Sequence, residues 1–184
     1  MDQGAENYAK YLHGDKAGLV WLVREYRPGL ILYINGIVRD MYAAEDLCED
    51  TFFRLITKKP RFDGKSSFKT WLYKIGRNIA YDKLRRESFL PRAELSEADA
   101  EAGRASLEAE VIKTERQKAL LKQLQNLSDN EKELIWLTYF EDMSAADVAR
   151  LTGKTVAATE KALSRAREKL RNMMEKEGYG NEDE

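Results

Sequence analysis

Cysteine and histidine are nearly absent from this sequence of 184 residues, since Cys48 and His13 are the only examples of each. A single cysteine cannot form a disulfide within the chain, and this pair cannot supply the usual ligand sets for zinc. We therefore expect a protein of the reducing cytoplasm with no metal and no cofactor. A glycine-rich phosphate loop followed by Lys and Ser or Thr is also missing, so the sequence predicts no catalytic residues and no enzyme activity.

Long apolar runs are missing as well. No run approaches the roughly 18 residues that cross a bilayer, so no membrane span is expected. The amino terminus, MDQGAENYAK, is acidic and polar, whereas a signal peptide is basic and then apolar. The sequence therefore predicts neither membrane insertion nor export.

Charges of both signs are plentiful, but they are unevenly distributed along the chain. The formal net charge is −1, yet segment 54–86 holds 11 basic and 2 acidic residues. Segment 87–116 holds 8 acidic and 4 basic residues, and segment 150–171 holds 7 basic and 2 acidic residues. Binding to nucleic acid depends on the local field and not on the total charge. The two basic segments are therefore candidates for contact with nucleic acid.

Apolar residues recur with the period of a helix along most of the chain, and no stretch shows the sustained alternation of a half-buried strand. The sequence therefore predicts an all-α fold. A segment rich in Glu, Ala and Ser, with Pro91 and Gly103, is typical of a flexible linker. We predict two small helical domains at 1–87 and 107–177, an acidic linker between them at 88–106, and a disordered tail at 178–184.

The first domain is expected to contain several packed helices. Pro28 is expected to end one helix and to separate it from the next. A further helix at about 43–57 would bury Ile56 and carry acidic side chains on its other face. Ser66 or Ser67 can cap the last helix of this domain.

The carboxyl-terminal part has the pattern of a helix-turn-helix. Ser144 can cap a short helix, a turn follows at Gly153, and a longer helix runs over about 155–175 with Val156 on its inner face. Contact with the major groove of duplex DNA is one interpretation, and a solvated cationic face on a structural hairpin is the alternative. The cations project from one side of the longer helix at four-residue intervals: Lys161, Arg165 and Lys169.

Aromatic residues are interleaved with cations in the first basic segment. An unpaired base can rest on such a ring while lysine and arginine follow the phosphates, and stacking contributes about 1–3 kcal/mol per base. The alternative is that Phe68 and Trp71 belong to the core. Their helical spacing leads us to expect that Trp71 is at least half structural. The aromatic residues are Phe62, Phe68, Trp71, Tyr73 and Tyr81.

Six stretches of the chain carry the motifs of one protein family. Three of them are 44–52 (AEDLCEDTF), 62–75 (FDGKSSFKTWLYKI) and 78–86 (NIAYDKLRR). The other three are Leu127-Ser128, 143–149 (MSAADVA) and 163–170 (LSRAREKL). In order and spacing they resemble domains two and four of the extracytoplasmic-function (ECF) sigma factors, of the sigma-70 family of bacterial RNA polymerase. Nothing in the sequence corresponds to a third DNA-binding domain between them, which fits the ECF group.

The resemblance implies a sigma factor that directs core RNA polymerase to specific promoters and assists promoter melting in transcription initiation. The implied partners are promoter DNA, the clamp helices of the largest polymerase subunit and the flap of the second. An anti-sigma factor is a further expected partner, and the free protein is expected to be a monomer. The residues implied in binding core polymerase are Asp46, Glu49, Asp50 and Phe53.

The resemblance assigns the −10 promoter element to the loop near residue 65 and the helix that follows it. This region would melt the duplex and hold a flipped base of the non-template strand, while its last arginines would hold the backbone. The implied residues are Lys65, Ser66, Ser67, Trp71, Lys74, Arg77, Asn78, Arg85 and Arg86.

The resemblance assigns the −35 promoter element to the longer helix of the helix-turn-helix. The chain departs from the family pattern at Glu160 and Ala162, where many relatives carry cations. Glu and Ala are good helix formers, so the departure affects the DNA contacts and the promoter sequence and leaves the helix intact. The implied residues are Lys154, Thr155, Ala158, Lys161, Ala162, Arg165 and Lys169.

Two other function classes stay open from the residues alone. One is a free-standing helix-turn-helix regulator that binds duplex DNA as a dimer, although the acidic helix face and the aromatic-basic segment argue against it. The other is an interaction protein whose charged faces bind only protein. Promoter-specific transcription that requires core polymerase would separate the three classes.

Overall fold

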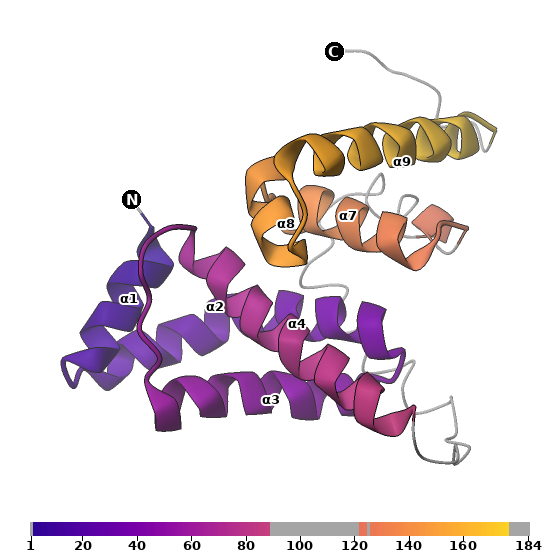
Figure 1. Cartoon of the computed structure of the whole chain (residues 1–184). Coiled ribbons are helices and arrows are strands. Elements are labelled where there is room, and N and C mark those ends of the chain that lie inside the picture. The colour runs from indigo at the N-terminus through magenta and orange to yellow at the C-terminus, as the bar shows by residue number, and fades with distance from the viewer. Residues whose placement is uncertain (1, 89–121, 125, 177–184) are drawn as a thin grey trace. The chain divides into compact units, whose positions relative to one another are not determined.

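The structure is a computed structural model that describes residues 2–88, 122–124 and 126–176 (Figure 1). Every regular element among these residues is a helix, which confirms the predicted all-α class. The chain divides into two compact units, Met1–Glu110 and Val111–Glu184, called here unit one and unit two. Apart from Ser88, the predicted linker at 88–106 lies outside the described residues, as does the predicted tail. The domain boundaries at 87 and 107 stay predictions.

Unit one contains four described helices: α1 (Gln3–Leu12), α2 (Lys16–Val38), α3 (Met41–Lys58) and α4 (Phe68–Glu87). Helix α2 packs against the other three (Figure 1). Each helix begins at a side chain that accepts a hydrogen bond from a first-turn amide, which compensates for the unpaired N–H groups at a helix start. The capping residues are Asp2, Asp15, Asp40 and Ser67.

The prediction that Pro28 ends a helix is wrong, because α2 continues through it from Lys16 to Val38. An internal proline removes one backbone hydrogen bond and crowds the preceding turn, at a cost of about 3 kcal/mol. The apolar residues on both sides of the proline face the same core, where Leu22, Leu30 and Ile34 are fully buried. Burial of one continuous apolar stripe offsets that cost and keeps the helix in one piece.

Helix α1 packs closely against the start of α2 because glycine stands at the contact. A Cβ atom placed on Gly18 would lie 2.2 Å from the backbone oxygen of Asn7. In the first turn of α1, a Cβ atom on Gly4 would lie 2.5 Å from the hydroxyl of Tyr26 and 2.7 Å from the Phe68 ring. No side chain fits in these spaces, so the placement of α1 depends on both glycines.

Asp2 ties the beginnings of two helices together. One carboxylate oxygen accepts a hydrogen bond from the amide of Ala5 in α1 (3.1 Å), and the other accepts from the amide of Phe68 in α4 (2.6 Å). Tyr8 of α1 also donates its hydroxyl to the carbonyl of Pro60, in the segment before α4 (2.8 Å). The amino-terminal helix is therefore fastened to the loop that precedes α4.

Unit two contains the described helices α7 (Asp129–Tyr139), α8 (Ala145–Thr152) and α9 (Val156–Lys176). Helix α7 opens with a capping box in which the Glu131 carboxylate accepts from the amide and hydroxyl of Ser128, and these bonds lower the pKa of Glu131. Gly153, with φ of 73°, ends α8 in the left-handed region. The fully buried residues here include Leu134, Ile135, Leu137, Val148 and Ala166.

Candidate nucleic-acid and protein interfaces

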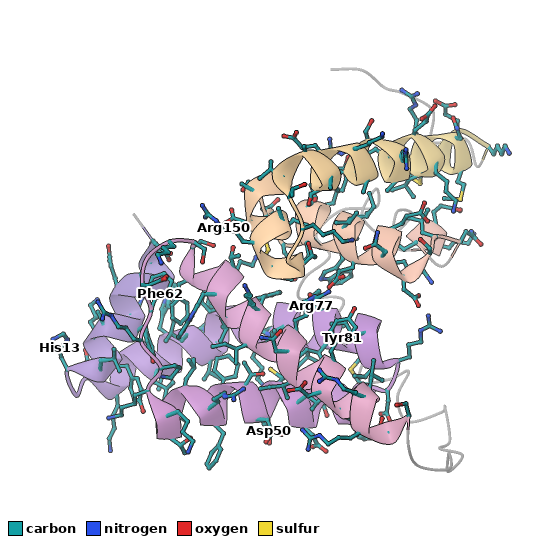
Figure 2. All side chains as sticks on the ribbon, viewed as in Figure 1. His13, Asp50, Phe62, Arg77, Tyr81 and Arg150 are labelled. Carbon is teal, nitrogen blue, oxygen red and sulfur yellow. The ribbon has the colours of Figure 1, made fainter. Side chains whose placement is uncertain are left out.

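Helix α3 presents an acidic stripe, defined here as Asp46, Glu49, Asp50 and Phe53. Their spacing of three, four and seven residues places them on one helix face. All four are exposed, as Figure 2 shows for Asp50, and Phe53 is 62% accessible. The three carboxylates form no ion pair with any residue in the described part of the chain. The stripe therefore combines uncompensated negative charge with an exposed aromatic ring.

Two further apolar residues extend the acidic stripe at its ends. Tyr42 lies one turn before Asp46 and is 54% accessible, and Ile56 lies one turn after Phe53 and is 40% accessible. The prediction that Ile56 is buried is wrong, because Leu55 and Phe52 occupy the inner face of this turn. Neither Tyr42 nor Ile56 was identified as a site residue from the sequence. A solvated acidic face needs no apolar ends, so this pattern is typical of a protein interface.

Helix α4 carries polar and aromatic residues along an outer face, defined as Trp71, Lys74, Asn78, Tyr81 and Arg85. Intervals of three or four residues align them along the helix. Lys74, Asn78 and Arg85 are exposed, and Tyr81 is 38% accessible. Tyr81 was not a predicted site residue, although its place among the cations was noted in the sequence.

The cations at the carboxyl-terminal end of α4 are held in place by neighbouring groups. The Arg77 guanidinium lies 4.4 Å from the centre of the Tyr81 ring (Figure 2). Arg85 forms an ion pair with Asp82 (2.7 Å), and Arg86 donates to the backbone oxygen of Asp82 (3.3 Å). All these groups are partly or fully exposed, so they keep contact with solvent while their positions are restricted.

Trp71 belongs to an aromatic cluster at the start of α4. The centre of its ring system lies 5.5 Å from that of Tyr8 and 5.4 Å from those of Phe62 and Phe68. Trp71 is half-buried and Phe68 is fully buried. This burial agrees with the expectation that Trp71 is at least half structural, and it leaves part of the indole at the surface.

The loop before α4 combines small residues with one long cation. Ser67 caps α4 by accepting from the amide of Thr70 (3.1 Å), and Ser66 donates to the carbonyl of Ser67 (3.2 Å). Lys65 lies 3.5 Å from the Asp63 carboxylate, and its side chain is 84% accessible. Phe62 precedes this loop and reaches the aromatic cluster (Figure 2). The loop therefore lies between two members of the aromatic cluster that includes Trp71, Phe62 and Phe68.

Helix α9 begins at Thr155, whose hydroxyl accepts from the amide of Ala158 (3.2 Å). The prediction that Val156 is buried is wrong: it is 45% accessible, because the packed part of the helix begins only at Thr159. Along the helix, four of the predicted residues share one face at intervals of three and four residues. They are Ala158, Lys161, Ala162 and Arg165, and all are exposed except the half-buried Ala162.

Two other predicted cations of unit two are joined to helix α7. Lys154 donates to the side-chain oxygen of Asn130, and Lys169 lies 3.2 Å from the Glu131 carboxylate. Arg167 lies on another side of α9, where its guanidinium is 5.8 Å from the Tyr139 ring centre. Within the described part of α9, Lys161 and Arg165 are the predicted cations that have no such partner.

The described residues contain no group of side chains arranged as in a catalytic site. Cys48 is buried, and burial raises the pKa of its thiol to about 12, so it carries no thiolate near neutral pH. No group of His, Cys, Asp and Glu in the described ranges could hold a metal ion. In the same ranges, no helix is long and apolar enough to cross a membrane.

Two protein-family models match the chain. The model described as Sigma-70 region 2 matches residues 22–89, and the model described as Sigma-70, region 4 matches residues 117–170. The first covers most of unit one, including α3 and α4, and the second covers α7, α8 and most of α9.

Curated proteins with similar sequences are RNA polymerase sigma factors by name. The ECF RNA polymerase sigma factor SigC of Mycobacterium tuberculosis is 30% identical over 138 residues, which are 71% of this chain and 70% of that protein. The sigma factor YlaC of Bacillus subtilis is 26% identical over 84% of this chain and 91% of its own length. The probable sigma factor RfaY of Xanthomonas campestris is 34% identical over 74% of this chain, but the match spans only 35% of that longer protein.

Solved structures share the fold. CnrH, in complex with the cytosolic domain of CnrY, matches with a TM-score of 0.65 and 24% identity over 95% of this chain and 98% of its own. The sigma factor RpoE of Bartonella quintana, in complex with the anti-sigma factor NepR, matches with a TM-score of 0.60 and 22% identity over 90% and 98%. At these identities the similarity establishes the fold alone.

Proposed function

Because this chain belongs to the ECF sigma factors of the sigma-70 family, and so directs RNA polymerase to promoters in transcription initiation, we propose that its two units divide this task between them. Unit one binds core polymerase through α3 and the −10 element through α4, and unit two binds the −35 element through α9. The observation that carries the proposal is that unit one exposes an acidic stripe on α3 and a cationic face on α4. A protein that bound only DNA would gain nothing from the acidic stripe beside its cationic face.

The acidic stripe is the proposed contact with the clamp helices of the largest polymerase subunit. Asp46, Glu49 and Asp50 repel one another at helical spacing, and a cationic partner relieves that repulsion. Phe53 supplies the aromatic side chain that is enriched at the core of protein interfaces. Tyr42 extends the same surface by one turn.

The outer face of α4 and the loop before it are the proposed contact with the −10 element. The exposed part of Trp71 offers a surface for an unpaired base, and Asn78 can both donate to and accept from a base edge. Lys65, Lys74, Arg77, Arg85 and Arg86 would follow the phosphates. Ser66 and Ser67 leave room for the strand because their side chains are short.

The exposed face of α9 is the proposed contact with the −35 element. Ala158 and Ala162 allow close approach to the groove and suit the methyl group of thymine, while Arg165 suits the acceptor edge of guanine. Lys161 can contact a base or a phosphate. Lys154 and Thr155 lie at the start of the helix, where the backbone amides favour a phosphate. The flap of the second polymerase subunit is the proposed protein partner of this unit.

We also propose that the chain binds an anti-sigma factor and acts in the cytoplasm as a non-catalytic protein that is monomeric when free. The similarity to CnrH and to RpoE of Bartonella quintana, both solved in complex with another protein, supports an inhibitory partner. An anti-sigma factor that covered the acidic stripe would exclude polymerase from the same residues.

In vitro transcription on a promoter library tests the proposed function. Core polymerase alone should give no promoter-specific transcripts, and core polymerase with this protein should give a defined set. If the folded protein gives no specific transcripts with core polymerase but binds duplex DNA by itself, a free-standing regulator replaces the sigma factor assignment. If it binds neither DNA nor core polymerase, an interaction protein of another kind is indicated.

Replacement of Arg165 by alanine should reduce transcription from the best promoters about tenfold and relax the preference at one position of the −35 element. The reason is that a good bidentate base contact contributes about 1–3 kcal/mol of discrimination. Transcript levels on a set of −35 variants provide the measurement. Arg167→Ala is the matched control, because Arg167 contacts Tyr139 instead of sharing the face of Lys161. Equal losses in both variants would contradict the assignment of this face.

A further inference from the structure

A pocket of about 670 Å³ lies between the first turn of α1 and the loop before α4. This volume falls within the range of about 300–1,000 Å³ that is usual for small-molecule sites. The loop side belongs to the region proposed to bind the −10 element, whereas no function has been assigned to α1. The lining residues are Asp2, Gln3, Ala5, Phe62, Gly64, Ser66 and Ser67.

Most polar side chains of the pocket already have hydrogen-bonding partners. Both carboxylate oxygens of Asp2 accept from backbone amides, those of Ala5 and Phe68. The Ser67 hydroxyl accepts from the amide of Thr70 and also pairs with the hydroxyl of that residue. These groups fix the shape of the pocket, and little of their hydrogen-bonding capacity is left for a ligand.

Gln3 is the exception among the polar residues of the lining. Its side chain is exposed and forms no hydrogen bond with any residue that the structure describes. Its backbone is nevertheless held firmly, since Gln3 is the first residue of α1 and its carbonyl accepts from the Asn7 side chain (2.9 Å). A primary amide offers one hydrogen-bond acceptor and two donors. From its fixed backbone position, the Gln3 side chain can therefore both donate and accept hydrogen bonds.

Phe62 gives the pocket an aromatic wall. Its ring is half-buried and is held in edge contacts with Phe68, at 5.7 Å between ring centres, and with Trp71, at 5.4 Å. Gly64 adds no side chain, and the exposed Lys65 stands next to it in the loop. Unpaired nucleotides are recognised by aromatic rings, by side chains that both donate and accept hydrogen bonds, and by nearby cations.

We propose that Gln3 contacts the base-pairing edge of a flipped non-template base in this pocket and thereby determines which base is preferred at one position of the −10 element. The four bases present donors and acceptors in different orders along that edge, so a primary amide held at one position matches some bases better than others. Helix α1 is then part of the DNA-binding surface, with Asp2 as the residue that positions it. The inference rests on the proposed function of unit one and adds a specificity-determining residue outside α4 and its loop.

The test uses Gln3→Met, which keeps the length of the side chain and removes the amide. Core polymerase with the full chain is used to transcribe a promoter library in which each position of the −10 element is varied. In the variant, the preference for one base over the others should fall about tenfold at one position of the −10 element. The base preferences at the other positions and in the −35 element should match those of the wild type. Glu6→Met is the matched control, because Glu6 is exposed on the same helix and does not line the pocket. This control should leave the whole profile unchanged.

The results distinguish this inference from the proposed function on which it rests. If the wild-type protein is active and the Gln3→Met profile matches it at every position, the inference about Gln3 fails alone. If Gln3→Met lowers transcription equally at all positions, the side chain affects stability or affinity in general, and the inference is again overturned. Absence of promoter-specific transcripts with the wild-type protein overturns both.

Discussion

Reversal of two charges in the acidic stripe, Asp46→Arg with Asp50→Arg, should reduce promoter-specific transcription at least about 100-fold at limiting concentrations of the protein. Both carboxylates are exposed and have no ion pair with a described residue, so the folded unit does not depend on them. Close charge pairs across an interface contribute about 1.5–7 kcal/mol each, and reversal replaces attraction by repulsion. The measurement is transcript yield as a function of protein concentration, together with binding of core polymerase to the isolated protein.

A matched control carries the same change in charge elsewhere on unit one. Glu6→Arg with Glu25→Arg reverses two exposed acidic residues on α1 and α2, away from the stripe on α3. This control should retain transcription within about twofold of the wild type. If the control and the stripe variant lose activity equally, net charge is responsible and the proposed polymerase contact is wrong. A stripe variant that binds core polymerase normally would contradict the assignment in the same way.

Gly18→Ala should lower the free energy of unfolding of unit one by about 3 kcal/mol. The new Cβ atom would lie 2.2 Å from the backbone oxygen of Asn7, so α1 and α2 must move apart. Overpacking usually costs 1–3 kcal/mol, and a clash with backbone belongs at the upper end because no side chain can rotate away. For a unit of this size the loss corresponds to a decrease in Tm of about 12–24 °C, measured by thermal unfolding of the full chain.

Gly36→Ala is the control for this prediction, since it makes the same change in the same helix. Apart from the neighbouring backbone of α2 itself, no atom of the described residues lies within 4 Å of a Cβ at Gly36, so the substitution removes only the flexibility of glycine. The expected result is a gain of up to about 1 kcal/mol. If Gly18→Ala unfolds at the same temperature as the wild type, α1 does not pack against α2 as described.

Capping and apolar period made much of the fold predictable. Ser67 and Ser144 stand at helix starts as their positions indicated, because their hydroxyls satisfy first-turn amides. The prediction that a helix ends at Pro28 was wrong because the sequence shows only the local cost of proline in a helix. The packing that overcomes this cost comes from residues distant in sequence. Helix α1 was not predicted, since its placement depends on contacts made by two glycines, and glycine leaves no apolar signal.

The placement of the residues on the proposed binding surfaces was partly predictable for the same physical reasons. Asp46, Glu49, Asp50 and Phe53 share a face because helical spacing alone places them there. The exposure of Ile56 and Val156 was not predictable, since each lies at an end of a helix where period no longer determines burial. Gln3 could not have been found from the sequence at all, because the pocket that it lines is formed by residues about 60 positions away.

The hydrogen bond between Asp2 and Phe68 cannot form until both residues have been synthesised. Asp2 leaves the ribosome among the first residues, and its partner in α4 is made 66 residues later. At translation rates of about 5–20 residues per second, this delay lasts about 3–13 s. Before then the nascent chain has neither the second half of the pocket nor the helix that closes the core of unit one. The complete pocket and the outer face of α4 therefore form only after α4 has been synthesised.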